Sequence, residues 1–311
     1  MSLGRKVIDS KVIDTSLRNR MTIKLFKWFL STVLLAQITL ADDNIDTAGA
    51  HAKRAQALVS RPAYFPHLNS NGCCFVIAHA GGGIDGNTYT NSLQAVDENY
   101  SLGTRYFEID LAFTSDGHWV ATHDWRHWLK KNLPNSSPDF IPTLEDFTKT
   151  RIKKERLSWS IEKSYPPSTL SDFSLYLQKH PDAHIVTDIK NLTQFQQLLN
   201  DIRQLPAKKQ FVLQVYNFEQ IAKVKETLPD AKIILTMYRL GNPQKFVDEI
   251  ETVRGELFGI TMPMNWVSDA FLKQANHWKL PVFLHGAPAN INSRQLHHSM
   301  GLRGVNGFYL D

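Results

Sequence analysis

Residues 106–124 of the chain read YFEIDLAFTSDGHWVATHD. Two strand-like runs, Tyr106–Leu111 and Trp119–His123, flank the turn signal Thr114–Gly117. The connection between them, Ala112–His118, is too short for the helical crossover that joins parallel strands, which takes about a dozen residues or more. We therefore predict that the two runs form a hairpin-like pair.

Further apolar runs of strand type recur at Phe75–Ala78, His184–Ile189, Phe211–Tyr216, Lys232–Met237, Phe258–Met262, Pro281–Leu284 and Gly307–Leu310. Helical stretches separate most of them, and cap signals stand at Asn91, Asn217 and Ser268. Strands that alternate with helices of about 10–15 residues imply βαβ units and an α/β fold. The pattern predicts a closed (β/α)₈ barrel, or TIM barrel, in which the hairpin is an irregularity between the second and third strands. A doubly wound open sheet is the alternative.

The charge of the chain is concentrated at its N-terminus. The sequence has 311 residues, of which 42% are hydrophobic and 21% charged, and a formal net charge of +5. Residues 1–41 hold seven basic and two acidic residues, so the remainder is neutral overall. A basic surface for nucleic acid therefore loses its main support, and we expect no nucleic-acid partner.

Residues 1–41 have the pattern of a signal peptide. Lys24 and Lys27 precede the apolar run Phe29–Leu40, which ends at a small residue, Ala41. The run is about a dozen residues long, whereas a transmembrane helix needs roughly 20. We predict cleavage and export to the periplasm or the medium, with 42–311 as a single domain; an uncleaved anchor is the alternative. Residues 1–20 are either an extended n-region or precede a true start at Met21.

Ionisable residues follow the predicted strands at the points where each strand ends: His79, Glu108, Asp110, His123, Asp188 and Lys190. The two-residue period of a strand places Glu108 and Asp110 on one face. Because the carboxyl ends of barrel strands converge on one rim, we expect all six side chains to lie close together.

Three carboxylates beside a lysine are costly to bury unless a cation compensates them. Glu108, Asp110 and Asp188 offer an all-oxygen ligand set, which suits one Mg²⁺ or Ca²⁺ better than Zn²⁺. His79 and His123 are then available as general acid and base near neutral pH. The run Gly81–Gly86 also matches a dinucleotide-binding pattern, but it does not open directly into a helix as that motif does.

These residues resemble the glycerophosphodiester phosphodiesterase family, within the wider group of barrel phosphodiesterases that includes phosphatidylinositol-specific phospholipase C and sphingomyelinase D. The resemblance rests on Tyr106–Leu111 through His123-Asp124, with support from Thr90–Leu93, Pro142–Glu145 and Gly304–Asp311. It implies a metal-dependent phosphodiesterase in which Glu108, Asp110 and Asp188 hold the cation. His79 and His123 would be the acid–base pair, and Lys190 would lie near the phosphate.

The chain departs from the family pattern at three places, one of which is Thr90, where the family has Glu before the Asn of its next motif. Ala80 stands where the family usually has Arg after the first histidine, so that phosphate contact is missing or comes from elsewhere, for example from Arg239. Asp188 stands where these enzymes usually have Glu. The segment Asp188-Ile189-Lys190 looks more like the corresponding strand of sphingomyelinase D. Further candidates for substrate binding are Asn91, Trp266 and His285.

The leading hypothesis is an exported phosphodiesterase that cleaves small glycerophosphodiesters or lysophospholipid head groups. A sphingomyelinase D-like enzyme that releases a cyclic phosphate is one alternative. A barrel that binds a phosphorylated ligand or a lipid surface without turnover is the other. The sequence leaves contact with a membrane surface and the oligomeric state open.

Overall fold

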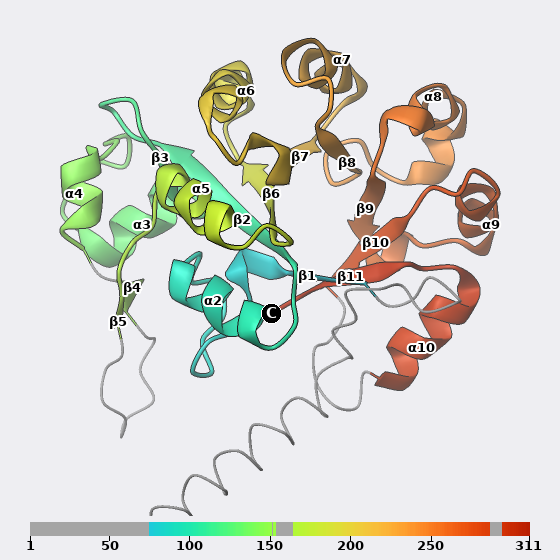
Figure 1. The fold of residues 1–311 in the computed structure, drawn as a ribbon, viewed down its shortest axis with the longest axis horizontal. Coiled ribbons are helices and arrows are strands. Elements are labelled where there is room, and N and C mark those ends of the chain that lie inside the picture. Colours follow the sequence, from blue (N-terminus) through green and yellow to red (C-terminus); the bar gives the residue numbers. More distant parts are fainter. Residues whose placement is uncertain (1–74, 151, 154–163, 287–293) are drawn as a thin grey trace, which may run out of the picture. The chain divides into compact units, whose positions relative to one another are not determined.

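In the computed structural model, which describes residues 75–150, 152–153, 164–286 and 294–311, eight parallel strands close into a barrel (Figure 1). The barrel strands are β1 (Phe75–Ala78), β2 (Tyr106–Phe113), β6 (His184–Ile189), β7 (Phe211–Val215), β8 (Lys232–Thr236), β9 (Gly259–Pro263), β10 (Val282–His285) and β11 (Gly307–Leu310). Strand β1 pairs with β11 on one side and with β2 on the other, which closes the ring. The predicted barrel is confirmed, and the open sheet is wrong.

The irregularity after the second strand is also confirmed. Strand β3 (Trp119–Ala121) runs antiparallel to the far end of β2, with Leu111 opposite Ala121. The backbone amide of Thr114 donates to the carbonyl of His118 at 2.8 Å, which closes the turn. Gly117 takes a φ of 87°, in the left-handed region that favours glycine.

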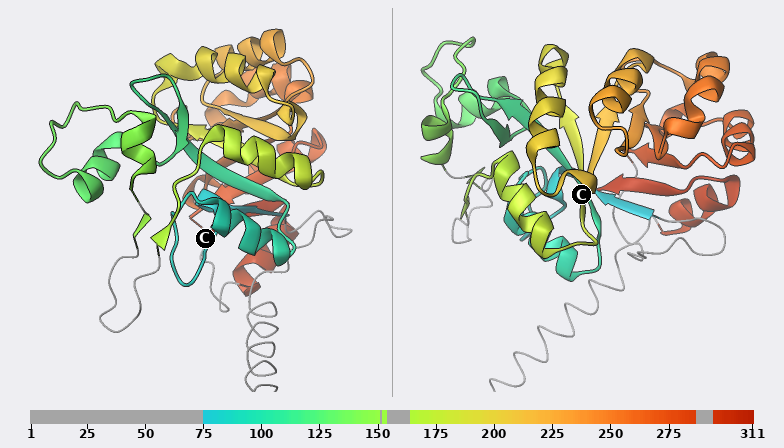
Figure 2. Two further views of the ribbon diagram at one scale, coloured as in Figure 1. Left: turned by 60° about the vertical axis from the view of Figure 1, so that its left-hand side comes forward. Right: turned by 45° about the horizontal axis from the view of Figure 1, so that its top comes forward.

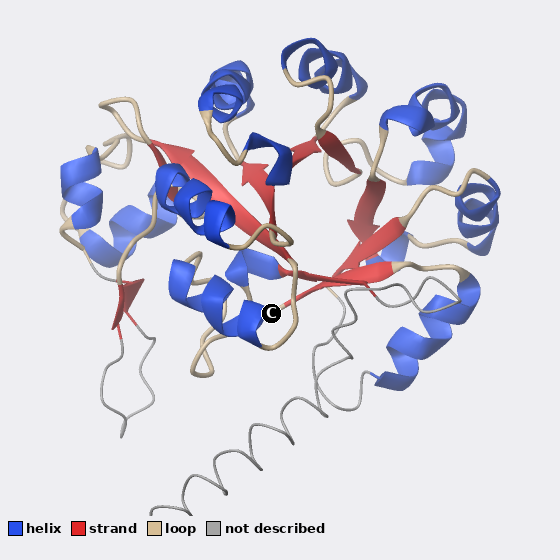
Figure 3. Ribbon diagram, in the orientation of Figure 1, coloured by secondary structure: helices blue, strands red, loops and turns tan. Residues whose placement is uncertain are grey.

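Helices surround the strands on the outside of the barrel, as Figure 2 and Figure 3 show. They are α2 (Leu93–Ser101), α5 (Leu170–Lys179), α6 (Phe195–Gln204), α7 (Phe218–Thr227), α8 (Val247–Val253), α9 (Asp269–His277) and α10 (Arg294–Arg303). Between β3 and α5 lie α3 (Trp125–Asn132), α4 (Leu144–Thr148), β4 (Ile152–Lys153) and β5 (Ser164–Tyr165). Short 3₁₀ helices cover His79–Gly81, Leu192–Gln194, Lys208–Gln210, Pro243–Phe246, Arg254–Glu256 and Met264–Trp266.

Two of the three predicted caps are confirmed. The side chain of Asn217 accepts from the amide of Gln220, and that of Ser268 accepts from the amide of Phe271. The prediction of Asn91 as the cap of α2 is wrong, because Ser92 has the extended backbone of a cap residue and accepts from the amide of Ala95.

Side chains point alternately into and out of the barrel along each strand, so the apolar residues form an inner and an outer cluster. Inward-facing residues fill the barrel with a cluster of their own: Ile77, Val186, Val212, Ile234, Phe283 and Tyr309. Outward-facing residues of β2, such as Phe107 and Ile109, belong to a larger cluster that includes the helices. The same alternation turns Glu108 and Asp110 inward, where both are buried.

The predicted signal peptide, residues 1–41, lies outside the described residues. Among the helices that the structure describes, none has the length and apolar character to cross a membrane.

Candidate active site

Glu108, Asp110 and Asp188 come together because their strands are neighbours in register. Strands β2 and β6 pair in parallel with Asp110 opposite Asp188, and Glu108 lies two residues earlier on the same face of β2. Carboxylate oxygens of the three residues lie within 4.8 Å of one another. Glu108 and Asp110 are only 2% and 1% exposed, whereas Asp188 is partly buried and lines the pocket.

Lys190 partly neutralises the three carboxylates. Its Nζ lies 2.6 Å from Oδ2 of Asp188 and 3.3 Å from Oδ1 of Asp110. Burial opposes the charge of the lysine, but Asp188 and Asp110 raise the pKa of Lys190 well above its ordinary value. The side chain is therefore a fixed positive charge at the pocket floor.

Other side chains orient the carboxylates. The side-chain amide of Asn91 donates to Oδ2 of Asp110 at 3.0 Å, and its carbonyl oxygen accepts from the backbone amide of Asp110 at 2.9 Å. The hydroxyl of Tyr216 donates to Oδ1 of Asp188 and accepts from the amide of Ile189 at 2.9 Å. Asn91 thus contacts a candidate metal ligand and does not line the pocket.

One carboxylate oxygen of the acidic group lacks a hydrogen-bond partner among the described residues. Oε2 of Glu108 accepts from the backbone amide of Ala80 at 2.8 Å, whereas its buried Oε1 has no hydrogen-bond partner among the described residues. Burial and the neighbouring charge of Asp110 raise the pKa of Glu108, and burial likewise raises the pKa of Asp188. A divalent cation would relieve both effects, so the donor set fits such an ion.

His79 follows β1 and lies between two carboxylates. Its Nδ1 is 2.8 Å from Oδ1 of Asp311, and its Nε2 is 3.8 Å from Oε2 of Glu108. Burial opposes protonation, but the hydrogen bond to Asp311 and the charge of Glu108 raise the pKa of His79 to about 9. The ring of Tyr89 packs edge-on against the imidazole, with 4.5 Å between centroids.

His123 follows β3, and its Nδ1 is hydrogen-bonded to the carboxylate of Asp124. Asp124 is the N-cap of α3, and it also accepts from the backbone amide of His127 at 2.8 Å. Burial works against ionisation of this carboxylate, but its hydrogen bonds, first that from the His127 amide, lower the pKa of Asp124 to about 2. A carboxylate that stays ionised holds the imidazole ring in place.

A pocket of about 670 Å³ brings the predicted residues together. Those that line it are His79, Glu108, His123, Asp188, Lys190, Arg239 and His285. Nε2 of His285 lies 2.7 Å from the hydroxyl of Thr261, and burial lowers the pKa of His285 to about 3, which keeps the ring neutral. Trp266 is not among the lining residues; it packs against Tyr238, which does line the pocket, with 6.4 Å between ring centroids.

Several lining residues were not predicted as site residues: Tyr89, Gln214, Tyr216, Thr236, Tyr238, Gly286, Tyr309 and Asp311. Two of them had a signal in the sequence. Asp311 follows a predicted strand as His79 does, and Tyr216 is the last residue of one, so the rule of strand ends applies to both. Tyr89 had no such signal, because a loop with several left-handed residues places it.

A pocket at the carboxyl ends of barrel strands is the place where enzymes of the TIM-barrel fold have their active sites. Its sequence and its pocket make this barrel that of a phosphoric diester hydrolase, as the family match shows. The sequence profile of the Glycerophosphoryl diester phosphodiesterase family matches residues 82–253, which is more than half of the chain, and the chain belongs to that family. The resemblance predicted from the sequence is confirmed.

Several solved structures have a similar fold. A protein from Galdieria sulphuraria, described as a candidate glycerophosphodiester phosphodiesterase, superimposes with a TM-score of 0.61 at 16% identity, over 76% of this chain and 94% of that one. A phosphodiesterase from Oleispira antarctica, in complex with the product sn-glycerol-3-phosphate, has a TM-score of 0.58 at 13% identity, over 76% and 92%. A glycerophosphoryl diester phosphodiesterase from Parabacteroides distasonis has a TM-score of 0.57 at 16% identity, over 80% of this chain and 86% of that one. No curated protein matches the chain in sequence.

Proposed function

We propose that the protein is a metal-dependent phosphodiesterase that cleaves glycerophosphodiesters or lysophospholipid head groups, with His79 and His123 as its acid–base pair. The observation that carries the proposal is the position of the acidic group. Glu108, Asp110 and Asp188 bring their ligand atoms within 4.8 Å of one another, at the pocket that both histidines line. The small product bound to the phosphodiesterase from Oleispira antarctica supports a substrate of this size.

The three carboxylates would hold one Mg²⁺ or Ca²⁺, because all of their donor atoms are oxygens and Oε1 of Glu108 lacks a partner among the described residues. When bound, the cation supplies positive charge to the phosphate oxygens and to the charge that develops on them during the reaction. Asn91 and Tyr216 hold Asp110 and Asp188 in place for this task.

The histidines move the protons. One imidazole removes the proton of the attacking hydroxyl or water, and the other protonates the leaving alcohol oxygen. Each ring is hydrogen-bonded through Nδ1 to a carboxylate, His79 to Asp311 and His123 to Asp124, so its Nε2 is the nitrogen available for proton transfer.

Arg239 supplies the second cationic contact to the phosphate, in place of the arginine that Ala80 replaces. Its guanidinium donates to the carbonyl of Lys190 at 2.8 Å and lies over the ring of Tyr216, 5.1 Å from the centroid. Among the described residues Arg239 forms no ion pair with a carboxylate, so its remaining donors are available to a ligand in the pocket that it lines.

We also propose that the protein is exported, on the strength of the basic and apolar pattern of residues 1–41. Mass spectrometry of the protein from the extracytoplasmic fraction tests this proposal. A mature N-terminus at Asp42 supports cleavage, and a chain that keeps residues 29–40 in the membrane fraction indicates an anchor.

The test of the activity is release of choline from glycerophosphocholine and lysophosphatidylcholine, with Mg²⁺, Ca²⁺ or EDTA. We expect turnover that EDTA abolishes and that His123→Ala lowers by about 10²-fold or more. His277→Ala, at an exposed histidine of α9, is the matched control. Turnover in EDTA, or an active His123→Ala protein, contradicts the proposal. Phosphorus NMR of the products separates a monophosphate from a persistent cyclic phosphate, and ligand binding without turnover would indicate a non-catalytic barrel.

A further inference from the structure

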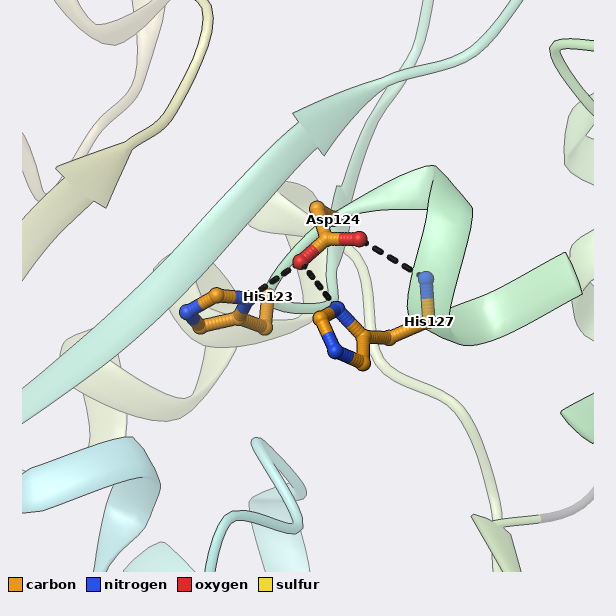
Figure 4. A group of neighbouring side chains, drawn as sticks. All are labelled: His123, Asp124 and His127. Carbon is orange, nitrogen blue, oxygen red and sulfur yellow. Dashed lines mark hydrogen bonds and ion pairs between the residues drawn. The ribbon is translucent and has the colours of Figure 1, made fainter. Parts of the chain in front are cut away.

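Two imidazole rings share one carboxylate at the start of α3. Nδ1 of His127 lies 2.7 Å from Oδ2 of Asp124, and Nδ1 of His123 is hydrogen-bonded to the same oxygen (Figure 4). The three atoms lie within 4.8 Å of one another. The side chains of His123 and His127 are 44% and 71% exposed, so solutes can reach this group.

The local sequence builds this arrangement. Strand β3 ends at Ala121 and α3 begins at Trp125, so the histidines at positions 123 and 127 stand four residues apart across the start of the helix. Asp124 is the cap, and its Oδ1 is taken by the backbone amide of His127. Its Oδ2 is left facing both rings, as Figure 4 shows. The N-cap role of Asp124 thus fixes its carboxylate, and Oδ2 of that carboxylate contacts Nδ1 of both His123 and His127.

Two imidazole nitrogens and one carboxylate oxygen are a ligand set for Zn²⁺ and related transition metals, not for Mg²⁺ or Ca²⁺. Tetrahedral ligands at about 2.0–2.1 Å from a metal are roughly 3.3 Å apart. The spacing of 2.7 Å between His127 and Asp124 must therefore widen slightly, which the exposed ring of His127 allows. The basic side chains of Arg126, Lys130 and Lys131 on α3 disfavour a cation held by charge alone, so affinity must come from the nitrogens.

We propose that His123, Asp124 and His127 form a second metal site, which takes Zn²⁺ or a similar transition-metal ion and leaves one position for water. We further infer that occupation of this site inhibits the phosphodiesterase, a step that rests on the proposed role of His123. With Nδ1 on the metal, the neutral ring carries its proton on Nε2, and that nitrogen can no longer accept one from the pocket.

The site differs chemically from the three-carboxylate group, and of its three residues only His123 lines the pocket. That group offers oxygen alone, whereas His123, Asp124 and His127 offer nitrogen and oxygen. A large excess of Mg²⁺ therefore occupies the oxygen group and leaves the nitrogen-containing site to a transition metal. This difference allows the two sites to be examined separately in one sample.

Co²⁺ is the direct probe, because its visible absorption reports ligation. The full chain, purified without a histidine tag, is titrated with Co²⁺ in excess Mg²⁺ alongside His127→Ala and the exposed-histidine control His277→Ala. We expect tight binding with an absorption change in the wild type and in His277→Ala, and an affinity at least about tenfold weaker in His127→Ala. Equal affinity in the wild type and His127→Ala, or no binding in the wild type, overturns the site.

Inhibition is measured as the ratio of diester cleavage rates with and without Zn²⁺ within each protein, in excess Mg²⁺. We expect a ratio well below one for the wild type and His277→Ala, and a ratio near one for His127→Ala. Zn²⁺ that binds without changing the rate overturns the inhibitory role. Absence of turnover in Mg²⁺ alone counts against the proposed function instead, and the Co²⁺ titration still decides whether the metal site exists.

Discussion

Nδ1 of His79 lies 2.8 Å from Oδ1 of Asp311, so the residue after the last strand of the barrel holds the residue after the first. The contact follows from closure of the barrel, since β1 and β11 pair in parallel with Ala78 opposite Leu310. It supplies a counter-charge to His79, and it leaves Nε2 without a hydrogen bond among the described residues, 3.8 Å from Oε2 of Glu108.

We predict that Asp311→Asn lowers kcat for diester cleavage by about 10- to 100-fold with little change in KM, because the amide neither fixes the ring as well nor offsets its charge. Steady-state kinetics in saturating Mg²⁺ measure the effect. The matched control is Asp269→Asn, which removes a carboxylate from an exposed ion pair with Arg303. A kcat equal to that of the wild type would mean that Asp311 has no part in positioning His79.

Asn91 gives a second prediction, because both ends of its amide contact Asp110. Asn91→Ala leaves the carboxylate and the backbone amide of Asp110 without these partners. We expect the concentration of Mg²⁺ that gives half-maximal activity to rise by about 10- to 100-fold, with kcat recovering at saturating Mg²⁺. Titration of activity with Mg²⁺ measures this constant.

The neighbouring residue provides the control for Asn91. Ser92→Ala removes the cap of α2 and should cost about 1 kcal/mol of the free energy of unfolding without changing the Mg²⁺ requirement. If the two variants show the same Mg²⁺ dependence, the effect of Asn91 is one of general stability and its assigned role is wrong.

The strand pattern made the barrel predictable from the sequence alone. Each apolar run that was predicted as a strand is a strand of the sheet, and the run Ala112–His118 was too short to be anything but a tight connection. The cap of α2 was the exception. Asn91 and Ser92 are both good cap residues, and only the contact with Asp110, remote in sequence, shows which one the helix uses.

The residues of the candidate site that lie on strands or directly after them were more predictable from the sequence than those in loops. Glu108, Asp110 and Asp188 meet because strand period and register fix them, and both are readable from a sequence once the barrel is inferred. Tyr89 was not predictable, because it lies in the left-handed region of the backbone in a loop, and its contact with His79 depends on that conformation. The sequence placed Asn91 near the pocket, but it did not show that Asn91 contacts the candidate metal ligand Asp110.

Arg239 gives a third prediction, about substrate binding. Its guanidinium is held by the Lys190 carbonyl and the Tyr216 ring and forms no ion pair among the described residues. Arg239→Met should raise KM for glycerophosphocholine by about tenfold or more, and Arg239→Lys should restore part of the loss, since a lysine keeps the charge but not the fork of donors. Arg203→Met, on the outer helix α6, is the control. An unchanged KM in Arg239→Met would show that the phosphate is bound without this residue.

The opposite end of the barrel gives a prediction about stability. His184 stacks on Tyr106 with 4.4 Å between ring centroids, and its Nε2 lies 2.8 Å from Nζ of Lys232. Burial, and then the charge of Lys232, lower the pKa of His184 to about 4. A histidine that is harder to protonate in the folded state contributes its full stability above the unfolded pKa of about 6.5, and that contribution is lost as the pH falls toward 4.

The measurement is the free energy of urea unfolding at about pH 7.5 and about pH 4.5, for the wild type and for His184→Gln. Other groups also titrate in this range, so only the difference between the two proteins isolates His184. We expect the wild type to lose about 1–2 kcal/mol more than the variant over this interval, after allowance for solvent screening of a partly exposed ring. Parallel losses in the two proteins would mean that neither burial nor the charge of Lys232 disfavours protonation of His184 in the folded protein.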